Sequence, residues 1–180
     1  MVYKAIIGKN IDLLPVEVGH AQFIVDLRND KEKCKYIHNV SDSLDDQIRW
    51  IEAQRKREGD YYFIIANKNG TSLGTVGLSS IVGKCGETSR FVSYGNAIEN
   101  VEANLLITDF AFDVIGLDYI KGYVGVENKK VISLQKKFGY IFDEEPSELD
   151  GMLIRYATLT PIDYMSRRDS IIALIKASEL

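Results

Sequence analysis

The stretch VENKKVISLQKKFGY, residues 126–140, predicts a helix with a clear signal at each end that leads directly into a strand. Asn128 caps helix N-termini well, because its side-chain oxygen can accept a hydrogen bond from a free backbone N–H of the first turn. Gly139 suits the left-handed conformation that ends a helix, and Lys136 and Lys137 suit the negative end of the helix dipole. A strand, a capped helix and a second strand predict a parallel step within a sheet.

Composition and charge bound the class of protein. The chain has 180 residues, 46% of them hydrophobic, so one domain over residues 1–180 can bury a core without a metal or a disulfide. A formal net charge of -4 argues against a nucleic-acid partner, because such proteins need a basic surface. Cys34, Cys85, His20 and His38 show no metal-ligand spacing, so we expect no metal site.

The N-terminal segment does not match a targeting signal. Lys4, Lys9, Asp12 and Glu17 interrupt its apolar pattern, which argues against a signal peptide and a membrane-spanning helix. We therefore expect no membrane partner and a location in the reducing cytoplasm.

Periodicity and turn residues predict a strand followed by two helices. The strand falls near residues 3–7, and Pro15 suits the first position of a helix. Ser43, with Asp46 three residues later, predicts the start of the second helix, and Gly59 predicts its C-terminal cap.

An antiparallel meander follows. Residues 61–66 and 72–78 are predicted strands, and Asn69-Gly70 between them favours a tight hairpin. A third strand covers residues 87–96.

The second half alternates helices and strands. Asn100 as N-cap and Gly116 as C-cap predict a long helix. The other elements are strands over 117–126, 140–145 and 152–160, the helix within 126–140, and a final helix over 161–178.

This order, strand-helix-helix-strand-strand-strand-helix-strand-helix-strand-strand, resembles that of the GNAT family of acetyl-CoA-dependent N-acetyltransferases. Asn128, Leu134, Lys137, Gly139 and Tyr140 look like the family pattern N-x-x-[AS]-x-x-L-Y-x-K-x-G-[FY]. The resemblance covers most of the chain. It implies a mixed α/β fold whose central, mostly antiparallel sheet is flanked by helices, with a parallel step between the fourth and fifth strands. The segments VDLRND and DFAFDVIGLDYIKGYVGVEN look like the RimJ/RimL-type branch.

The resemblance implies the direct transfer of an acetyl group from acetyl-CoA to a primary amine. In GNAT proteins the CoA diphosphate lies at the N-terminus of the helix after the fourth strand, where free N–H groups attract phosphate. Backbone amides of the strand would polarise the thioester. The residues expected to bind the cofactor are Val92, Ser93, Tyr94, Asn96, Asn100, Val101, Glu102, Ala103, Asn104, Asn128, Val131, Ser133, Lys136 and Lys137.

The expected phosphate loop departs from the family pattern R/Q-x-x-G-x-G/A. Asn96, Ile98 and Asn100 stand where small residues would align, and isoleucine resists the left-handed backbone that glycine allows. Glu99 and Glu102 place negative charge near the phosphate, although Glu102 can equally complement the helix dipole.

Two positions of the cofactor helix also differ from the family. Gln135 stands where GNAT proteins commonly carry the tyrosine that protonates the leaving thiolate, and glutamine cannot give up a proton. Val131 replaces a small residue and can crowd the pantetheine arm, for which Ser133 compensates only if it faces the cleft.

Glu87 is the candidate general base, and Tyr94 is the candidate donor toward the thioester or the leaving sulfur. A carboxylate acting through water can take the proton of a substrate ammonium group, whose pKa is about 10. Asp26 and Asp60 are less favoured bases. Alternatively, Glu87 is a solvated residue at a loop exit and Tyr94 is a packing residue of a strand.

The resemblance places the acceptor between the first two helices, their loop and the last hairpin. Arg28 can clamp a phosphate or carboxylate, or it can pair with a neighbouring aspartate. The candidate acceptors are a small-molecule amine, such as an amino sugar, and a protein N-terminus. The residues expected to contribute are Arg28, Asn29, Tyr61, His38, Asn39 and the segment 144–151.

Two other interpretations stay open. The altered loop, Val131 and Gln135 allow a GNAT-fold protein that no longer catalyses and serves as a CoA-binding or protein-interaction module. A plain structural domain would make the Asn128 motif a coincidence. A homodimer through the final strand or the last helix is compatible with the sequence.

Overall fold

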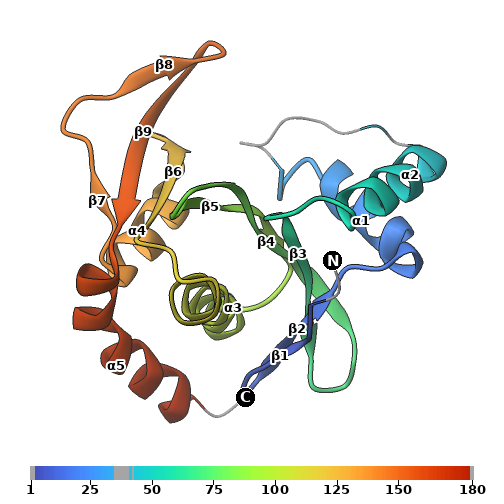
Figure 1. Cartoon of the computed structure of the whole chain (residues 1–180), viewed down its shortest axis with the longest axis horizontal. Helices are drawn as coiled ribbons and strands as arrows, with labels where there is room; N and C mark the ends of the chain where they lie inside the picture. The colour runs from blue at the N-terminus through green and yellow to red at the C-terminus, as the bar shows by residue number, and fades with distance from the viewer. Residues whose placement is uncertain (1–2, 35–40, 42, 179–180) are drawn as a thin grey trace.

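The computed structural model describes residues 3–34, 41 and 43–178, which form a twisted sheet with helices on both faces (Figure 1). The strands are β1 (Ile6–Ile7), β2 (Ile11–Pro15), β3 (Tyr61–Asn67), β4 (Ser72–Val82), β5 (Cys85–Ser93), β6 (Tyr119–Gly125), β7 (Ile141–Phe142), β8 (Ser147–Leu149) and β9 (Met152–Leu159). The helices are η1 (Val18–His20), α1 (Ala21–Asn29), α2 (Leu44–Gln54), α3 (Ala97–Asp109), η2 (Phe110–Val114), α4 (Lys129–Phe138) and α5 (Pro161–Ala177).

The described strands form one sheet in the order β1-β2-β3-β4-β5-β6-β9-β7, with β8 paired to β9. The step from β5 to β6 is parallel, and the other neighbouring pairs are antiparallel. This topology confirms the predicted GNAT-type sheet. The parallel pair corresponds to the predicted fourth and fifth strands, because the β1–β2 hairpin adds one strand at the start of the chain.

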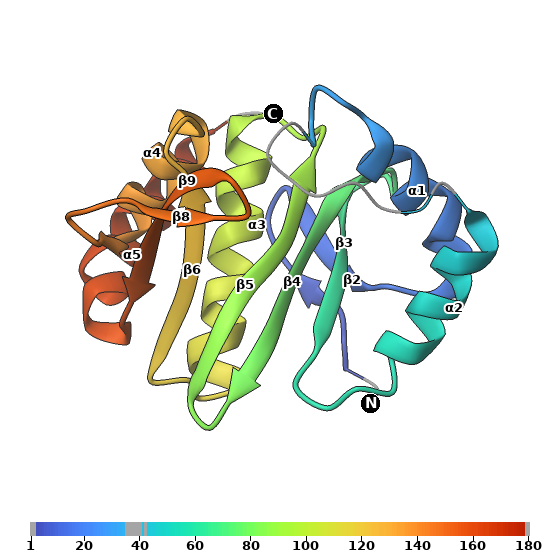
Figure 2. The same cartoon turned by 90° about the horizontal axis from the view of Figure 1, so that it is seen from above.

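The parallel pairing of β5 and β6 is short. It joins residues 85–87 to residues 119–121, whereas β6 pairs along its other edge with β9 up to Gly125. Beyond residue 87 the two strands diverge, and α3 is visible behind the opening between them (Figure 2).

Apolar side chains pack on both faces of the sheet. Phe63 and Ile65 of β3 join Phe138 in a large cluster on the side of α3, α4 and α5. Tyr62 and Ile64, which alternate with them along β3, belong to a smaller cluster with α1 and α2. The sheet is therefore buried on both sides around β3.

A polar cluster fastens α5 to α3. The Tyr164 hydroxyl donates to Asp109 at 2.6 Å, and the Arg168 guanidinium donates to both oxygens of the same carboxylate at 2.8 Å. The Lys9 ammonium group donates to carbonyl groups at the C-terminal end of α5 at 3.0–3.1 Å. A cation there complements the negative end of the helix dipole.

The predicted caps of α4 and the N-caps of α2 and α5 are confirmed. The Asn128 side chain accepts the Val131 N–H at 3.3 Å, and Gly139 has a φ of 95° at the end of α4. Ser43 caps α2 and Thr160 caps α5, each by accepting an N–H three residues later. The final helix ends at Ala177, one residue before the predicted boundary at 178.

Two early boundaries are wrong. Pro15 ends strand β2 opposite Phe63 instead of opening a helix, and α1 begins at Ala21. Proline is tolerated at a strand end, so its fixed φ did not distinguish the two roles. Helix α2 ends at Gln54, and Gly59, with a φ of 70°, lies in the turn beyond it.

The polar cluster of Asp109, Tyr164 and Arg168, which joins α3 to α5, gives a stability prediction. Asp109→Asn weakens the partner of the Arg168 guanidinium, so we expect it to lower the free energy of unfolding by about 1–3 kcal/mol. Tyr164→Phe removes one hydrogen bond and should cost about 1 kcal/mol. Urea unfolding at constant m measures both. Asp169→Asn, which changes an exposed carboxylate of α5, is the control. An Asp109 variant as stable as that control would show that the polar cluster does not stabilise the fold.

Candidate functional site

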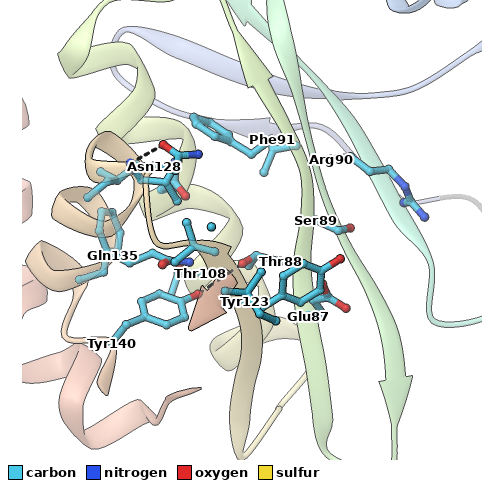
Figure 3. A pocket seen from close by; sticks show the side chains of 18 of the residues that line it. Glu87, Thr88, Ser89, Arg90, Phe91, Thr108, Tyr123, Asn128, Gln135 and Tyr140 are labelled. Carbon is cyan, nitrogen blue, oxygen red and sulfur yellow. Dashed lines mark hydrogen bonds between the residues drawn. The ribbon is translucent and has the colours of Figure 1, made fainter. Parts of the chain in front are cut away.

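A cleft of about 320 Å3 opens where β5 and β6 diverge (Figure 3). Its walls come mainly from β5, β6, α3 and α4. The described residues that line it are Arg28, Val76, Glu87, Thr88, Ser89, Arg90, Phe91, Asn104, Thr108, Tyr123, Val124, Gly125, Asn128, Val131, Leu134, Gln135, Phe138, Tyr140, Met152 and Ile154.

Strand alternation divides the β5 wall between the two faces of the sheet. Gly86 faces the α3 side, because a Cβ at that position would meet Leu117 of the main core. Thr88 shares this side, whereas Glu87 and Ser89 point to the opposite side, where α1 and α2 lie. The cleft therefore reaches both faces of the sheet.

Strand β5 bulges at Arg90, which has a φ of 55° where the register against β4 shifts. This conformation is uncommon for residues other than glycine, and tertiary contacts hold it. The Arg90 guanidinium donates to both oxygens of Asp60 at 2.6 and 3.1 Å and lies over the rings of Trp50 and Tyr62. The Thr75 hydroxyl donates to the Arg90 carbonyl at 2.7 Å. Because a bulge bends its strand, it helps β5 turn away from β6.

The cleft lies against residues 87–91 of β5 and not against the predicted segment from Val92 to Tyr94. Val92 is buried in a cluster with Leu27 and Cys34. The Tyr94 N–H donates to the Leu73 carbonyl at 2.7 Å, which completes the pairing with β4. The backbone of β5 that borders the cleft is therefore the segment around the bulge.

Glu87 lines the cleft, as predicted for a general base. Burial raises the pKa of its carboxyl group above the ordinary value near 4.5, while a hydrogen bond from Ser80 and the charge of Arg90 act in the opposite direction. A carboxylate with a raised pKa is a stronger proton acceptor at neutral pH.

The other predicted acid-base residues make interactions outside the cleft. Asp60 forms an ion pair with Arg90, and Asp26 accepts a hydrogen bond from Gln22 at 2.8 Å on the surface. The Tyr94 hydroxyl donates to Asp30 at 3.0 Å, and its side chain is 46% exposed and does not line the cleft. This position gives no support to Tyr94 as the proton donor.

Helix α4 supplies one wall of the cleft. Asn128, Val131, Leu134 and Gln135 all line it, and the buried Oε1 of Gln135 accepts no hydrogen bond from the described residues. Of the other cofactor residues predicted on this helix, Ser133, Lys136 and Lys137 are exposed and lie outside the lining.

The N-terminus of α3 differs from the prediction. Asn96, not Asn100, is the N-cap, and its side chain accepts the N–H groups of Ile98 and Glu99 at 2.9 and 3.0 Å. The Glu99 carboxylate in turn accepts the Asn96 N–H at 2.7 Å. The amides that would hold a phosphate are therefore occupied by the helix's own side chains, one of them negatively charged.

Most of the next turn of α3 faces away from the cleft. Val101 and Ala103 are buried in the core, so their side chains cannot reach a ligand there. The buried Glu102 carboxylate accepts the backbone N–H groups of Lys9 and Asn10 in the β1–β2 turn. Glu102 thus stabilises this hairpin, and neither the predicted phosphate contact nor the dipole accounts for its position.

The two asparagines of this turn hold it together. The Asn100 amide donates to the Gly95 carbonyl at 2.9 Å, and the Asn104 amide donates to the Asn100 carbonyl at 2.9 Å. Asn104 also lines the cleft and is the one predicted cofactor residue of α3 that does so.

A second cavity of about 380 Å3 lies on the side of α1 and α2. Arg28 and Arg90 line both cavities, so the second one borders the first. The described residues that line it are Ile24, Arg28, Ser41, Asp46, Gln47, Trp50, Tyr62 and Arg90.

Of the predicted acceptor residues, Arg28 is placed at this second cavity. Asn29 is not among the residues that line it, and Tyr61 packs edge-on against Tyr3 and Phe110 in the core. His38 and Asn39 lie outside the described residues. The sequence analysis did not predict Trp50 as a site residue. Its aromatic side chain is evident from the sequence, but its position at the cavity depends on its contact with Arg90.

Other classes of site can be surveyed over the same residues. In the described part of the chain, no three histidine, cysteine or acidic side chains are grouped so as to hold a metal ion. The helices of residues 3–34 and 43–178 include none with the length and hydropathy needed to cross a membrane.

Residues 10–141 match the family described as acetyltransferase (GNAT) domain. The chain belongs to the GNAT acetyltransferase family. The match covers most of the elements that build the cleft, and it confirms the predicted class of enzyme, an acyltransferase of the GNAT type.

Solved structures share the fold of this GNAT chain. Apo FdhC, described as a nucleotide-linked sugar GNAT, has a TM-score of 0.80 and 24% identity, over 96% of this chain and 97% of its own. A GCN5-related N-acetyltransferase from Brucella melitensis has a TM-score of 0.78 and 14% identity, over 96% and 85%. Spermidine N-acetyltransferase from Vibrio cholerae, in complex with CoA and spermine, has a TM-score of 0.77 and 18% identity, over 88% and 99%.

At these identities the structural likeness shows the fold, not the substrate. No curated protein matches the sequence of the chain significantly. The comparisons do not separate the RimJ/RimL-like branch from other branches of the family.

The two ends of the expected cofactor site fit acetyl-CoA differently. The cleft is partly apolar and lined in part by α4, and the Gln135 Oε1, which has no partner among the described residues, can accept a pantetheine amide N–H. At the diphosphate end, Asn96 and Glu99 already occupy the helix amides. The residues present thus fit the arm of the cofactor, and the diphosphate gains less from the helix than in a loop of glycines.

This difference predicts the effect of one charge on cofactor affinity. Glu99→Gln keeps a side chain that can complete the capping box but removes the negative charge beside the diphosphate. We expect CoA to bind about two- to fivefold more tightly, with the gain shrinking as salt is added. Calorimetric titration measures this, with the exposed Glu52→Gln as control. A Glu99 variant with unchanged or weaker affinity would place the diphosphate elsewhere.

Proposed function

We propose that this protein transfers an acetyl group from the thioester of acetyl-CoA to a primary amine. The observation that carries the proposal is the cleft between β5 and β6, which reaches both faces of the sheet and has Glu87 on the side of α1 and α2. Such a passage lets a thioester and an amine approach each other from opposite sides, and this arrangement lowers the entropic cost of the reaction.

Bound acetyl-CoA would supply an activated acyl carbon, whose C–S bond breaks with its electron pair on sulfur as the C–N bond to the amine forms. Glu87 accepts the proton that the substrate ammonium group must lose, directly or through one water. Gln135 supplies no proton to the sulfur. None is required of the chain, because a thiol pKa of about 8.5 lets water protonate the thiolate.

The cofactor arm would run along α4. Asn128, Val131 and Gln135 are the lining residues we assign to it, together with Asn104 of α3. We keep Asn96 among the residues at the diphosphate end. The diphosphate must either replace the Asn96 side chain at the amides of α3 or bind without those amides. The positions of Val101, Glu102 and Ala103 do not support a role in cofactor binding.

For the acceptor we favour a small-molecule amine, and among these an amino sugar. The second cavity is lined by the aromatic residue Trp50, which suits a sugar ring or a base, and by the cation Arg28, which suits a phosphate. Apo FdhC, whose fold this chain shares, is described as a nucleotide-linked sugar GNAT, and we take that acceptor class as the first to test. A protein N-terminus, as expected for the RimJ/RimL-like branch, is the other acceptor to test.

The free cysteines Cys34 and Cys85 support a reducing, cytoplasmic location as part of this proposal. The proposed homodimer and the single domain over residues 1–180 stay predictions.

A second candidate function rests on the capped helix. Because Asn96 and Glu99 occupy the amides of α3 and Gln135 replaces a proton donor, a GNAT-fold module that binds partners without catalysis is the alternative. The enzyme must bind the cofactor, whereas a module that only binds a protein partner need not.

Calorimetric titration with CoA and acetyl-CoA tests this difference. We expect binding in the micromolar range, with a rise in thermal stability, because a ligand at 100 times its Kd stabilises the folded state by about 2.7 kcal/mol. No binding at millimolar ligand would favour the non-catalytic module.

The role of Glu87 makes a further prediction. Glu87→Gln should lower kcat by about 100- to 10,000-fold with an amine acceptor. Because burial raises the pKa of Glu87, the wild-type rate should fall as the pH drops through a value above 4.5, and the variant should lack this limb. Glu148→Gln, an exposed carboxylate of β8, is the control. A Glu87 variant with the wild-type rate and pH profile would remove this residue from the mechanism.

A further inference from the structure

Strand β4 carries a bulge directly beside Glu87. Ser79 pairs with Glu87, and the register against β5 then shifts before the next pair, at Val82. Two residues of β4, Ser80 and Ile81, thus stand against a single residue of β5, which is the pattern of a β-bulge. Ser80 has a φ of 55°, a conformation that is uncommon for residues other than glycine.

The bulge changes the side of the sheet that Ser80 faces. Leu78 belongs to the main core on the α3 side, so strict alternation along the strand would turn Ser80 to that side as well. Instead Ile81 packs against this core, and a Cβ at Gly86 would lie 3.3 Å from its side chain. Ser80 is exposed. The bulge therefore leaves two consecutive serines, Ser79 and Ser80, on the side of Glu87.

The two serines use their hydroxyl groups differently. The Ser80 hydroxyl donates to the Glu87 carboxylate. The hydroxyls of Ser79 and Ser89 bond to each other at 2.8 Å, and Ser89 points to the same side of β5 as Glu87 (Figure 3). A carboxylate has two oxygens that accept hydrogen bonds, so a single hydroxyl can hold one of them and leave the other for a ligand in the cleft.

Packing and backbone conformation do not account for a serine at this position. Glycine would adopt a φ of 55° without the steric cost that any Cβ adds, and the exposed side chain of Ser80 contributes little to the core. Residues held in such conformations cluster at functional sites, where the surrounding structure maintains them. What serine adds here, compared with glycine, is the hydroxyl that meets Glu87.

We propose that Ser80 is a positioning residue for Glu87, whose hydroxyl holds one carboxylate oxygen and leaves the other to receive the proton of the acceptor amine. This inference rests on the proposed function, because it concerns the base of the same reaction. The ammonium N–H bond breaks with its electron pair left on nitrogen, and the proton moves to the second carboxylate oxygen, directly or through one water. Ser80 neither gains nor loses a proton, so it acts only through Glu87.

Other charged or titratable side chains line the same cleft or lie on elements next to Glu87. They are Arg28 of α1, Asp60 before β3, Arg90 of β5, and Lys121 and Tyr123 of β6. A substitution at Ser80 leaves all of them in place. A difference between the wild type and a Ser80 variant therefore reports the contact between Ser80 and Glu87.

Two substitutions separate the hydroxyl from the backbone. Ser80→Ala and Ser80→Gly both remove the hydroxyl, but only glycine adopts the φ of the bulge freely. Ser80→Gly should therefore be at least as stable toward urea as Ser80→Ala. If Ser80 served only to shape the bulge, glycine would preserve the behaviour of Glu87.

An NMR titration of the free protein tests the contact without any substrate. The carboxyl carbons of glutamate are labelled with 13C, and Glu87→Gln identifies the signal of Glu87. We expect the pKa of the Glu87 carboxyl to lie higher in both Ser80 variants than in the wild type, because a hydrogen bond to the carboxylate favours its charged form. Ser147→Ala, which removes an exposed hydroxyl of β8, should leave this pKa unchanged.

Acetyl transfer from acetyl-CoA to glucosamine, and to a short peptide with a free N-terminus, gives the second measurement. We expect kcat to fall about three- to tenfold in both Ser80 variants while KM for the acceptor stays near the wild-type value, because the hydroxyl orients the base and does not touch the acceptor. The acidic limb of the rate should move to higher pH, in the direction of the raised pKa of Glu87. Ser147→Ala should match the wild type.

The outcomes separate the two proposals. An unchanged pKa of Glu87 in both variants, or a Ser80→Gly protein with the wild-type kcat and pH profile, overturns the inference and leaves the proposed function standing. If the wild type neither binds acetyl-CoA nor acetylates either acceptor, the proposed function fails and the inference fails with it, whatever the titration shows.

Discussion

Strands β5 and β6 pair in parallel over three residues and then separate, and the rest of the site depends on this short pairing. Strand β6 pairs along its other edge with β9, and β5 is bent by the bulge at Arg90. The energy that holds the bulge comes from the α1–α2 face, where Arg90 meets Asp60 and the ring of Trp50. A contact on one face of the sheet therefore keeps open a cleft that is lined largely from the other face.

The same constraint explains why α3 and α5 are tied so firmly. Among the described residues, the β5–β6 pairing that joins the two halves of the sheet ends at residue 87, so beyond that point helices bridge the two halves. Helix α3 lies behind the opening (Figure 2), and the Asp109 carboxylate links it to Arg168 and Tyr164 of α5, which follows β9. The helices thus hold together the two parts of the sheet where strand pairing does not.

Local signals in the sequence were sufficient for the elements that cap themselves. Asn128, Gly139 and Thr160 act through neighbours three or four residues away, and the structure confirms each of them. The start of α3 was not decidable in this way. Asn96 and Asn100 are both good caps, and the choice of Asn96 depends on Glu99 and on the contact of Asn100 with the Gly95 carbonyl.

The sequence analysis predicted some of the side chains that line the cleft, but not the roles that depend on distant partners. Glu87, Asn104, Asn128 and Val131 were expected and do line the cleft, whereas the roles of Glu102 and Tyr94 depend on partners far away in sequence. No period or spacing relates Glu102 to the turn at Lys9 and Asn10, because that pairing arises when the β1–β2 hairpin meets α3.

In the proposed mode of CoA binding, the cleft would supply most of the binding energy. A capping side chain contributes about 1 kcal/mol to its helix, so displacing Asn96 is affordable, but the charge of Glu99 would remain beside a diphosphate. Burial of the arm and the acyl group along α4 must supply what the helix dipole does not.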